Sequence, residues 1–166
     1  MSWPISPNGS LWPIIGSETP ITNWSSSLPS APDADDIRFI EDPGCQQMVG
    51  YRTRLDRHAG TCTVTLELED KHLNRHGILH GGMVATLLDV VCGNTASHYF
   101  DPIDHAPLVT VSLNLNYVAA ARAGTVTATA RPAGGGKSIA YINGELRDAE
   151  GQMLATASGI FKRIRT

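Results

Sequence analysis

Apolar and polar residues alternate along most of the second half of the chain, and this pattern predicts β-strands. Residues 109–117 read Val-Thr-Val-Ser-Leu-Asn-Leu-Asn-Tyr, with an apolar or aromatic side chain at every odd position. The segments 126–130, 138–147 and 153–163 follow, with no helical pattern between them. Because successive side chains of a strand point to opposite faces, this spacing predicts a sheet with one buried face.

Two further strands are predicted before these four. Residues 61–68 alternate threonine or glutamate with apolar residues, and residues 48–55 form a weaker strand pattern that ends before Gly60. Glycine-containing turns at 134–136 and 150–151 separate the later strands. Together these segments predict an antiparallel sheet of five to six strands.

A segment of a different kind runs from about Gly82 to Tyr99, because it is apolar on nearly every side. Asp89 is its only Asp, Glu, Lys or Arg. Helices with apolar residues all round are buried in a core rather than laid on a surface. One long buried helix among antiparallel strands predicts an α+β fold in which the sheet wraps around the helix.

The first part of the chain lacks this regularity. Residues 1–36 contain six of the ten prolines and all the tryptophans, which are Trp3, Trp12 and Trp24. This composition favours a flexible tail, but tryptophan gains much from burial, so a docked arm and a disordered extension both remain open. Asp33 or Asp35 is a possible N-cap of a short helical turn that runs through Ile40. We therefore divide the chain into a Pro/Ser/Trp-rich arm, residues 1–36, and one domain, residues 37–166.

Composition excludes several classes of function. The formal net charge of -3 and the scattered Lys and Arg residues argue against nucleic-acid binding. No Lys or Arg precedes Arg38 and no apolar run reaches 18 residues, so we expect neither a signal peptide nor a membrane span. Cys45, Cys62 and Cys92 form no CxxC pair, which favours a reducing cytoplasm.

Asp89 is the residue that most needs an explanation. A carboxylate beside Leu88 and Val90 costs several kcal/mol unless it is paired, so function is the leading explanation. Glycines at the start of a helix let the unpaired first-turn amides approach a ligand. Gly81 and Gly82 are therefore a possible oxyanion site for a tetrahedral intermediate, with Asp89 as the base or nucleophile.

The spacing of these residues predicts a site that is shared between two chains. Asp89 lies seven residues after Gly82, which is about 10 Å along a helix at 1.5 Å per residue. Reacting groups must approach one carbonyl group within about 3 to 3.5 Å. We therefore expect the amides and Asp89 at one site to come from different copies of the chain, at a homodimer interface.

The motif as a whole resembles a known family. Asn74-x-x-Gly-x-x-His80-Gly81-Gly82, then Asp89, then the strand 111–117 and Gly-Gly-Lys-Ser at 135–138, is similar to the hotdog-fold acyl-CoA thioesterases of the phenylacetate-degradation type. The resemblance covers about residues 45–164. It implies a hotdog fold, hydrolysis of an acyl- or aryl-CoA without metal or other cofactor, and a homodimer or a dimer of dimers.

The resemblance also implies roles for single residues. Asp89 would be the general base or the nucleophile, and Gly82 would be the amide donor to the thioester oxygen, with His80 beside it. Asn74 would hold the attacking water or the thioester, and Thr110 would lie near the water. Gly136, Lys137 and Ser138 would lie in a substrate-binding hairpin beside coenzyme A.

Several other interpretations remain open at this point. Asp89 could be a structural acid that is hydrogen-bonded to backbone or to a threonine. His72, His76 and His80 recur every four residues, as metal ligands on a helix do, but the glycines between and after them argue against a helix. We expect His80 to be a neutral histidine that lines the site, and the other two to be solvated or structural. An acyl-CoA sensor without turnover and an enoyl-thioester hydratase are the alternative functions.

Overall fold

The computed structural model describes residues 36–164, so the predicted arm and its tryptophans lie outside the described residues apart from Asp36. No helix in this range is long and apolar enough to cross a lipid bilayer. The elements, in chain order, are β1 (Ile37–Ile40), α1 (Cys45–Val49), β2 (Arg52–Asp56), β3 (Thr61–Glu67), a 3-10 turn η2 (Asp70–His72), α2 (Gly81–Phe100), β4 (Leu108–Tyr117), β5 (Thr125–Gly135), β6 (Ile139–Arg147) and β7 (Met153–Arg163).

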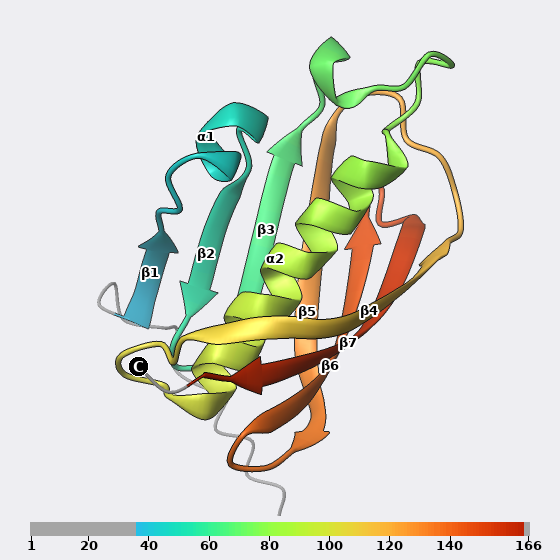
Figure 1. Cartoon of the computed structure of the whole chain (residues 1–166). Coiled ribbons are helices and arrows are strands. Elements are labelled where there is room, and N and C mark those ends of the chain that lie inside the picture. Colours follow the sequence, from blue (N-terminus) through green and yellow to red (C-terminus); the bar gives the residue numbers. More distant parts are fainter. Residues whose placement is uncertain (1–35, 165–166) are drawn as a thin grey trace, which may run out of the picture. The chain divides into compact units, whose positions relative to one another are not determined.

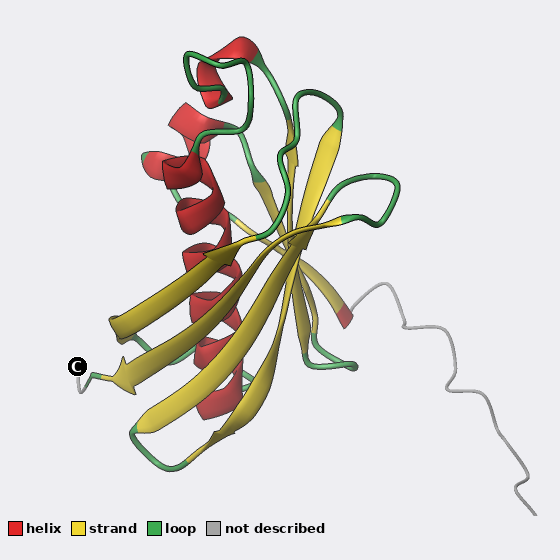
Figure 2. Ribbon diagram, turned by 90° about the vertical axis from the view of Figure 1, so that its right-hand side faces the viewer, coloured by secondary structure: helices red, strands yellow, loops and turns green. Residues whose placement is uncertain are grey.

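The strands form one antiparallel sheet in the order β1-β2-β3-β5-β6-β7-β4. The chain leaves α2 and returns along the far edge of the sheet, so that β4 pairs only with β7 (Figure 1). The curved sheet holds α2 against one of its faces (Figure 2), and α2 contacts β3, β4, β5, β6 and β7. The predicted α+β plan with one main helix is confirmed.

The core lies between α2 and the inner face of the sheet. The alternation on β3, β5 and β6 places every second side chain against the helix, as the sequence predicts. Burial of this face supplies the main free energy of folding. The largest fully buried side chains are Phe161, Leu55, Leu66, Leu87, Leu88, Ile142, Leu146, Leu154, His72, Val64, Val91 and Val126.

Two predictions near the start of the domain are wrong. Ile37–Ile40 is not a helical turn but a strand, and it pairs with β2, which brings the sheet to seven strands. Its β-branched and aromatic residues gain a partner strand that local sequence does not reveal. The predicted strand 48–55 begins only at Arg52, because Cys45–Val49 is helical and Gly50 ends that helix with a positive φ of 92°.

The strict alternation predicted for β4 is also wrong at one position. The register with β7 shifts just after Thr110, so Val111 is an extra, bulged residue. Thr110 lies opposite Phe161 and Leu113 lies opposite Gly159; both of these β7 residues are buried, and the Phe161 ring lies against Gly93 of α2. The bulge therefore turns Thr110 towards α2, whereas unbroken alternation would have turned it away.

Gly144 on β6 allows α2 to lie close to the sheet. A Cβ atom at this position would be 2.8 Å from Cys92 Sγ and 3.3 Å from Leu88 Cδ2. Gly144→Ala is therefore expected to lower the free energy of unfolding by about 1–3 kcal/mol, the usual cost of overpacking a core. Urea unfolding measures this, with Gly136→Ala as the control because an added Cβ there has nothing within 4 Å. Equal effects of the two substitutions would contradict the packing explanation.

Two histidines lie close together near the end of α2. The ring centroids of His98 and His105 are 6.1 Å apart. Nδ1 of His98 and Nε2 of His105 are buried and have no hydrogen-bond partner among residues 36–164. Burial is the main cause that lowers the pKa of His98, and the positive charge of Arg57 lowers it further. Burial, and after it Arg38, lowers the pKa of His105, against a small opposing effect of Asp101.

Both lowered pKa values predict that the domain loses stability on mild acidification. The unfolded chain binds protons on these residues around the ordinary histidine pKa of about 6.5, whereas the folded chain does so only at lower pH. The stabilisation is therefore present above about pH 6.5 and is lost as the pH falls towards the folded-state values. Urea unfolding at about pH 7.5 and about pH 5.5 measures the difference. The double variant His98→Gln, His105→Gln should show a smaller difference, and an unchanged difference would rule out these two residues.

Candidate functional site

Asp89 lies near the middle of α2 and is half-buried. Its partner is a hydroxyl group: Thr110 Oγ1 donates to Asp89 Oδ1 over 2.9 Å. Within residues 36–164 the other carboxylate oxygen, Oδ2, accepts no hydrogen bond. One oxygen is thus held in place while the other remains open to a ligand or to water.

His80 caps the start of α2. Its backbone is extended, with φ -65° and ψ 134°, and its Nδ1 accepts a hydrogen bond from the Gly82 amide over 2.9 Å. Because a backbone amide can only donate, Nδ1 carries no proton, and neutral His80 must hold its proton on Nε2. The Gly82 amide, which we predicted as the oxyanion donor, is therefore already occupied. The Gly81 amide makes no hydrogen bond in the described part of the chain.

Asn74 is placed by the tight turn that precedes His80. Its backbone amide donates to Ile78 O over 2.8 Å, and its carbonyl accepts from the amide of Gly77, whose φ is 65°. Its side-chain Oδ1 accepts from the His76 amide over 2.8 Å. The Oδ1 atom is thus used within the turn, which leaves the Nδ2 group as the part of Asn74 that can donate to a ligand.

His72 and His76, the other two histidines that recur every four residues, lie in different environments. His72 is buried; its Nδ1 accepts from the Glu69 amide over 2.9 Å, and its Nε2 therefore donates to Val49 O over 2.7 Å. His76 is exposed. We expected these two histidines to be solvated or structural, and the structure makes His72 structural and His76 solvated. In the range that the structure describes, no group of three or more His, Cys, Asp or Glu is arranged to hold a metal ion.

The two halves of the predicted chemistry lie apart within one chain. Gly81 and Asp89 are eight residues apart on one helix, which corresponds to about 12 Å along its axis. At the helix start, Tyr117 Oη donates to Gly81 O over 3.2 Å. Tyr117 is the last residue of β4, whereas Thr110, which holds Asp89, is near the first. We call residues 74–82 the glycine turn; this turn and Asp89 are therefore at opposite ends of β4.

The predicted coenzyme A hairpin is elsewhere in the chain. Gly136, Lys137 and Ser138 join β5 to β6 and are exposed. Gly135, which we expected in the turn, ends β5 instead, and a Cβ there would lie 3.2 Å from the ring of Tyr99 at the end of α2. Along α2 of one chain, this hairpin therefore lies beyond Asp89, at the end of the helix away from that chain's own glycine turn.

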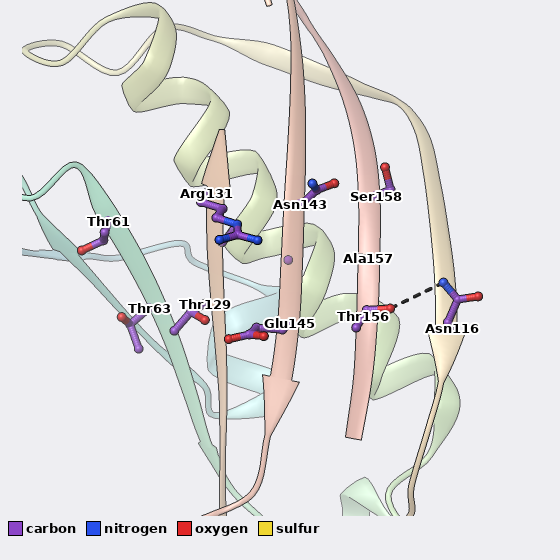
Figure 3. A pocket seen from close by; sticks show the side chains of 12 residues that line it. Thr61, Thr63, Asn116, Thr129, Arg131, Asn143, Glu145, Thr156, Ala157 and Ser158 are labelled. Carbon is purple, nitrogen blue, oxygen red and sulfur yellow. Dashed lines mark hydrogen bonds between the residues drawn. The ribbon is translucent and has the colours of Figure 1, made fainter. Parts of the chain in front are cut away.

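A hollow of about 660 Å³ lies on the outer face of the sheet, opposite α2 (Figure 3). Its polar side chains follow the strand register, with Thr129 opposite Glu145 and Arg131 opposite Asn143. None of the predicted site residues lines it. A second hollow of about 640 Å³, lined by residues of β1, α1 and β2, also excludes them. Within one chain, Asp89 therefore does not lie in either of these hollows.

Two residues that contact the glycine turn were not predicted from the sequence. Tyr117 contacts Gly81, and Arg122 Nη1 donates to the carbonyl groups of His76 and Gly77 over 3.0 and 3.3 Å. Each of these contacts joins two residues that are between 36 and 46 positions apart in the sequence. A single sequence has no signal for such distant pairs, and only the fold reveals them.

Comparison with known proteins adds independent evidence. The family model of the thioesterase superfamily matches residues 76–155. Acyl-coenzyme A thioesterase 13 of Mus musculus is 30% identical over 115 residues, which are 68% of this chain and 80% of that protein. A phenylacetic acid degradation-related protein from Ralstonia eutropha JMP134 has a TM-score of 0.65 and 28% identity, over 74% of this chain and 92% of that one. A thioesterase from Haemophilus influenzae, with a TM-score of 0.68 and 19% identity, covers 75% of this chain and 85% of that one, and it supports the fold alone.

The family match, the identity to the mouse enzyme and the antiparallel sheet around one long helix agree with one another. The fold is the hotdog fold, and the chain belongs to the thioesterase superfamily as a thioester hydrolase.

Proposed function

We propose that this protein hydrolyses an acyl- or aryl-CoA thioester to the free acid and coenzyme A, with Asp89 as the general base or nucleophile. The observation that carries the proposal is the state of the Asp89 carboxylate. Thr110 donates to one carboxylate oxygen, and the other accepts no hydrogen bond among residues 36–164, although the residue is half-buried on an otherwise apolar helix. A charge on an otherwise apolar helix costs free energy unless it is paired, and Asp89 has a single hydrogen bond among residues 36–164 to offset that cost.

The proposed site needs a second chain, and β4 is the surface that would bind it. This edge strand has ten residues without a charged side chain or a proline. Val109, Val111 and Tyr117 are 46%, 57% and 59% exposed. Long neutral edges readily pair with another strand, and natural proteins protect them when they are not used. We infer that two copies of β4 pair across a two-fold axis.

Such pairing would complete the site. If two β4 strands pair antiparallel about their centres, the Tyr117 end of one lies beside the Thr110 end of the other. Tyr117 contacts Gly81, and Thr110 holds Asp89, so the glycine turn of one chain would face Asp89 of its partner. This arrangement removes the separation of about 12 Å that prevents both groups of one chain from acting on one thioester.

The groups then have complementary roles. The Gly81 amide and the Nδ2 group of Asn74 are donors without a partner among the described residues, and they would bind the thioester oxygen as charge develops on it. The Nε2 proton of His80 is a third donor at the same turn. Asp89 of the other chain would take a proton from water as the water attacks the carbonyl carbon, or would attack that carbon itself to give a mixed anhydride that water then opens. In either route the carbon–sulfur bond breaks and coenzyme A leaves as the thiolate, which then takes up a proton.

The test of this function is release of free coenzyme A from a panel of acyl- and aryl-CoA thioesters, measured with a thiol reagent. Turnover of at least one thioester supports hydrolysis, whereas tight binding without thiol release would support a sensor instead. A single turnover in ¹⁸O-labelled water tests the anhydride route. Label in the Asp89 carboxylate indicates an anhydride that water opens at the Asp89 carboxyl carbon, whereas label only in the product acid excludes opening at that carbon.

A further inference from the structure

The turn that carries Asn74 is held by a segment far from it in sequence. Residues 118–124, which follow β4, form no regular element. Ala121 O accepts from the Leu79 amide over 2.8 Å, and Arg122 Nη1 donates to His76 O and Gly77 O. Tyr117, the last residue of β4, also donates to Gly81 O. Together these contacts reach both ends of residues 74–82, from the Asn74 turn to the start of α2.

The Arg122 contact has a specific effect on the turn. Residues Asn74 to Ile78 are closed by two backbone hydrogen bonds and by two hydrogen bonds that the Asn74 side chain accepts, and the turn tip is exposed. The carbonyl groups at the tip would otherwise face only solvent. One guanidinium group bonded to two adjacent carbonyl groups fixes their direction, because its donors are held in a rigid plane.

We propose that Arg122 is a positioning residue, which holds the 74–78 turn so that Asn74 and the Gly81 amide meet the thioester oxygen. The proposal rests on the proposed function, in which these donors stabilise the transition state. Arg122 acts through the backbone of the turn. Its segment is continuous with β4, so the strand that would pair with the partner also sets the place of the donors. Misplacement of positioned groups by about 1 Å can cost a hundredfold in rate.

Arg122→Gln tests this role. We expect kcat to fall about tenfold to a hundredfold while KM stays within about twofold, because the lost interaction orients donors and does not bind coenzyme A. Arg122→Lys should recover part of kcat, since one ammonium group can still reach one carbonyl. Arg75→Gln is the matched control: Arg75 lies in the same turn and is exposed, but its side chain bonds only the His76 ring. This control should retain kcat within about twofold.

A second measurement does not depend on turnover. Amide hydrogen exchange of His76 and Gly77 should be at least about tenfold faster in Arg122→Gln than in the wild type or in Arg75→Gln, because local opening of the turn becomes easier. Unchanged exchange overturns the proposal whatever happens to kcat, and so does a rise in KM at constant kcat, which would indicate direct contact with substrate. If the wild type hydrolyses no thioester of the panel, the proposed function fails, and the exchange result alone then decides whether Arg122 holds the turn.

Discussion

Asp89→Asn is expected to lower kcat by about a hundredfold to ten-thousandfold, the usual contribution of a general base, with little change in substrate binding. Asparagine has nearly the same shape as aspartate, and its Oδ1 can still accept the hydrogen bond from Thr110. The substitution removes the negative charge and the ability to take a proton or attack a carbonyl carbon. Steady-state release of coenzyme A measures kcat, and equilibrium binding of a non-hydrolysable thioester analogue measures affinity.

Asp104→Asn is the matched control for this prediction. Asp104 is an exposed carboxylate in the loop after α2, and the same chemical change there should leave kcat within about twofold. Thermal unfolding of both variants should match that of the wild type. If Asp89→Asn keeps more than about a tenth of wild-type kcat, Asp89 is neither the base nor the nucleophile.

Mixed dimers should recover activity from two inactive variants. In Gly81→Pro the amide proton is missing, and we expect kcat to fall about a hundredfold or more, as when an oxyanion donor is removed. Proline suits this position, because Gly81 is the first residue of α2 and His80 before it is already extended. A dimer of one Asp89→Asn chain and one Gly81→Pro chain would have one site with both defects and one intact site.

If equal amounts of the two chains pair at random, about half of the dimers are mixed. Each mixed dimer has one intact site of two, so about a quarter of wild-type activity should return. Co-expression with two affinity tags isolates the mixed dimer for the assay. Gly81→Ala is the control, because it keeps the amide and its Cβ would make only an ordinary 3.5 Å contact with Tyr117. A mixed dimer as inactive as its parents would show that each site uses the glycine turn and Asp89 of the same chain.

The sequence predicts the larger features of this fold well. Alternation on residues 61–68 and 153–163 corresponds to β3 and β7, and the apolar segment 82–99 corresponds to α2 within one residue at each end. These features depend on burial of one face over many residues, and that pattern is visible locally. The short strand β1 was not visible, because four residues gain their conformation only from the neighbouring strand.

The sequence points to the residues of the proposed site but not to their hydrogen bonds. The spacing of Asn74, His80 and Asp89 pointed to one region, and the structure places the first two at one turn. The bulge at Val111, which directs Thr110 to Asp89, changes the side-chain period by one residue, and alternation in sequence cannot show this. The hydrogen bond from the Gly82 amide to His80 Nδ1 depends on the rotamer of His80, and the sequence cannot show this either.

The neutral edge of β4 also affects how variants of this protein will behave during purification. If β4 pairs between two copies as proposed, a chain that cannot form this pairing still presents ten extended residues with free backbone groups, and such a strand can join other chains without limit. Substitutions that weaken pairing are therefore expected to reduce the yield of dispersed protein before they reduce the activity of what remains. For this enzyme, loss of yield and rising light scattering would report on the proposed subunit contact, whereas loss of kcat at normal yield would report on the chemistry.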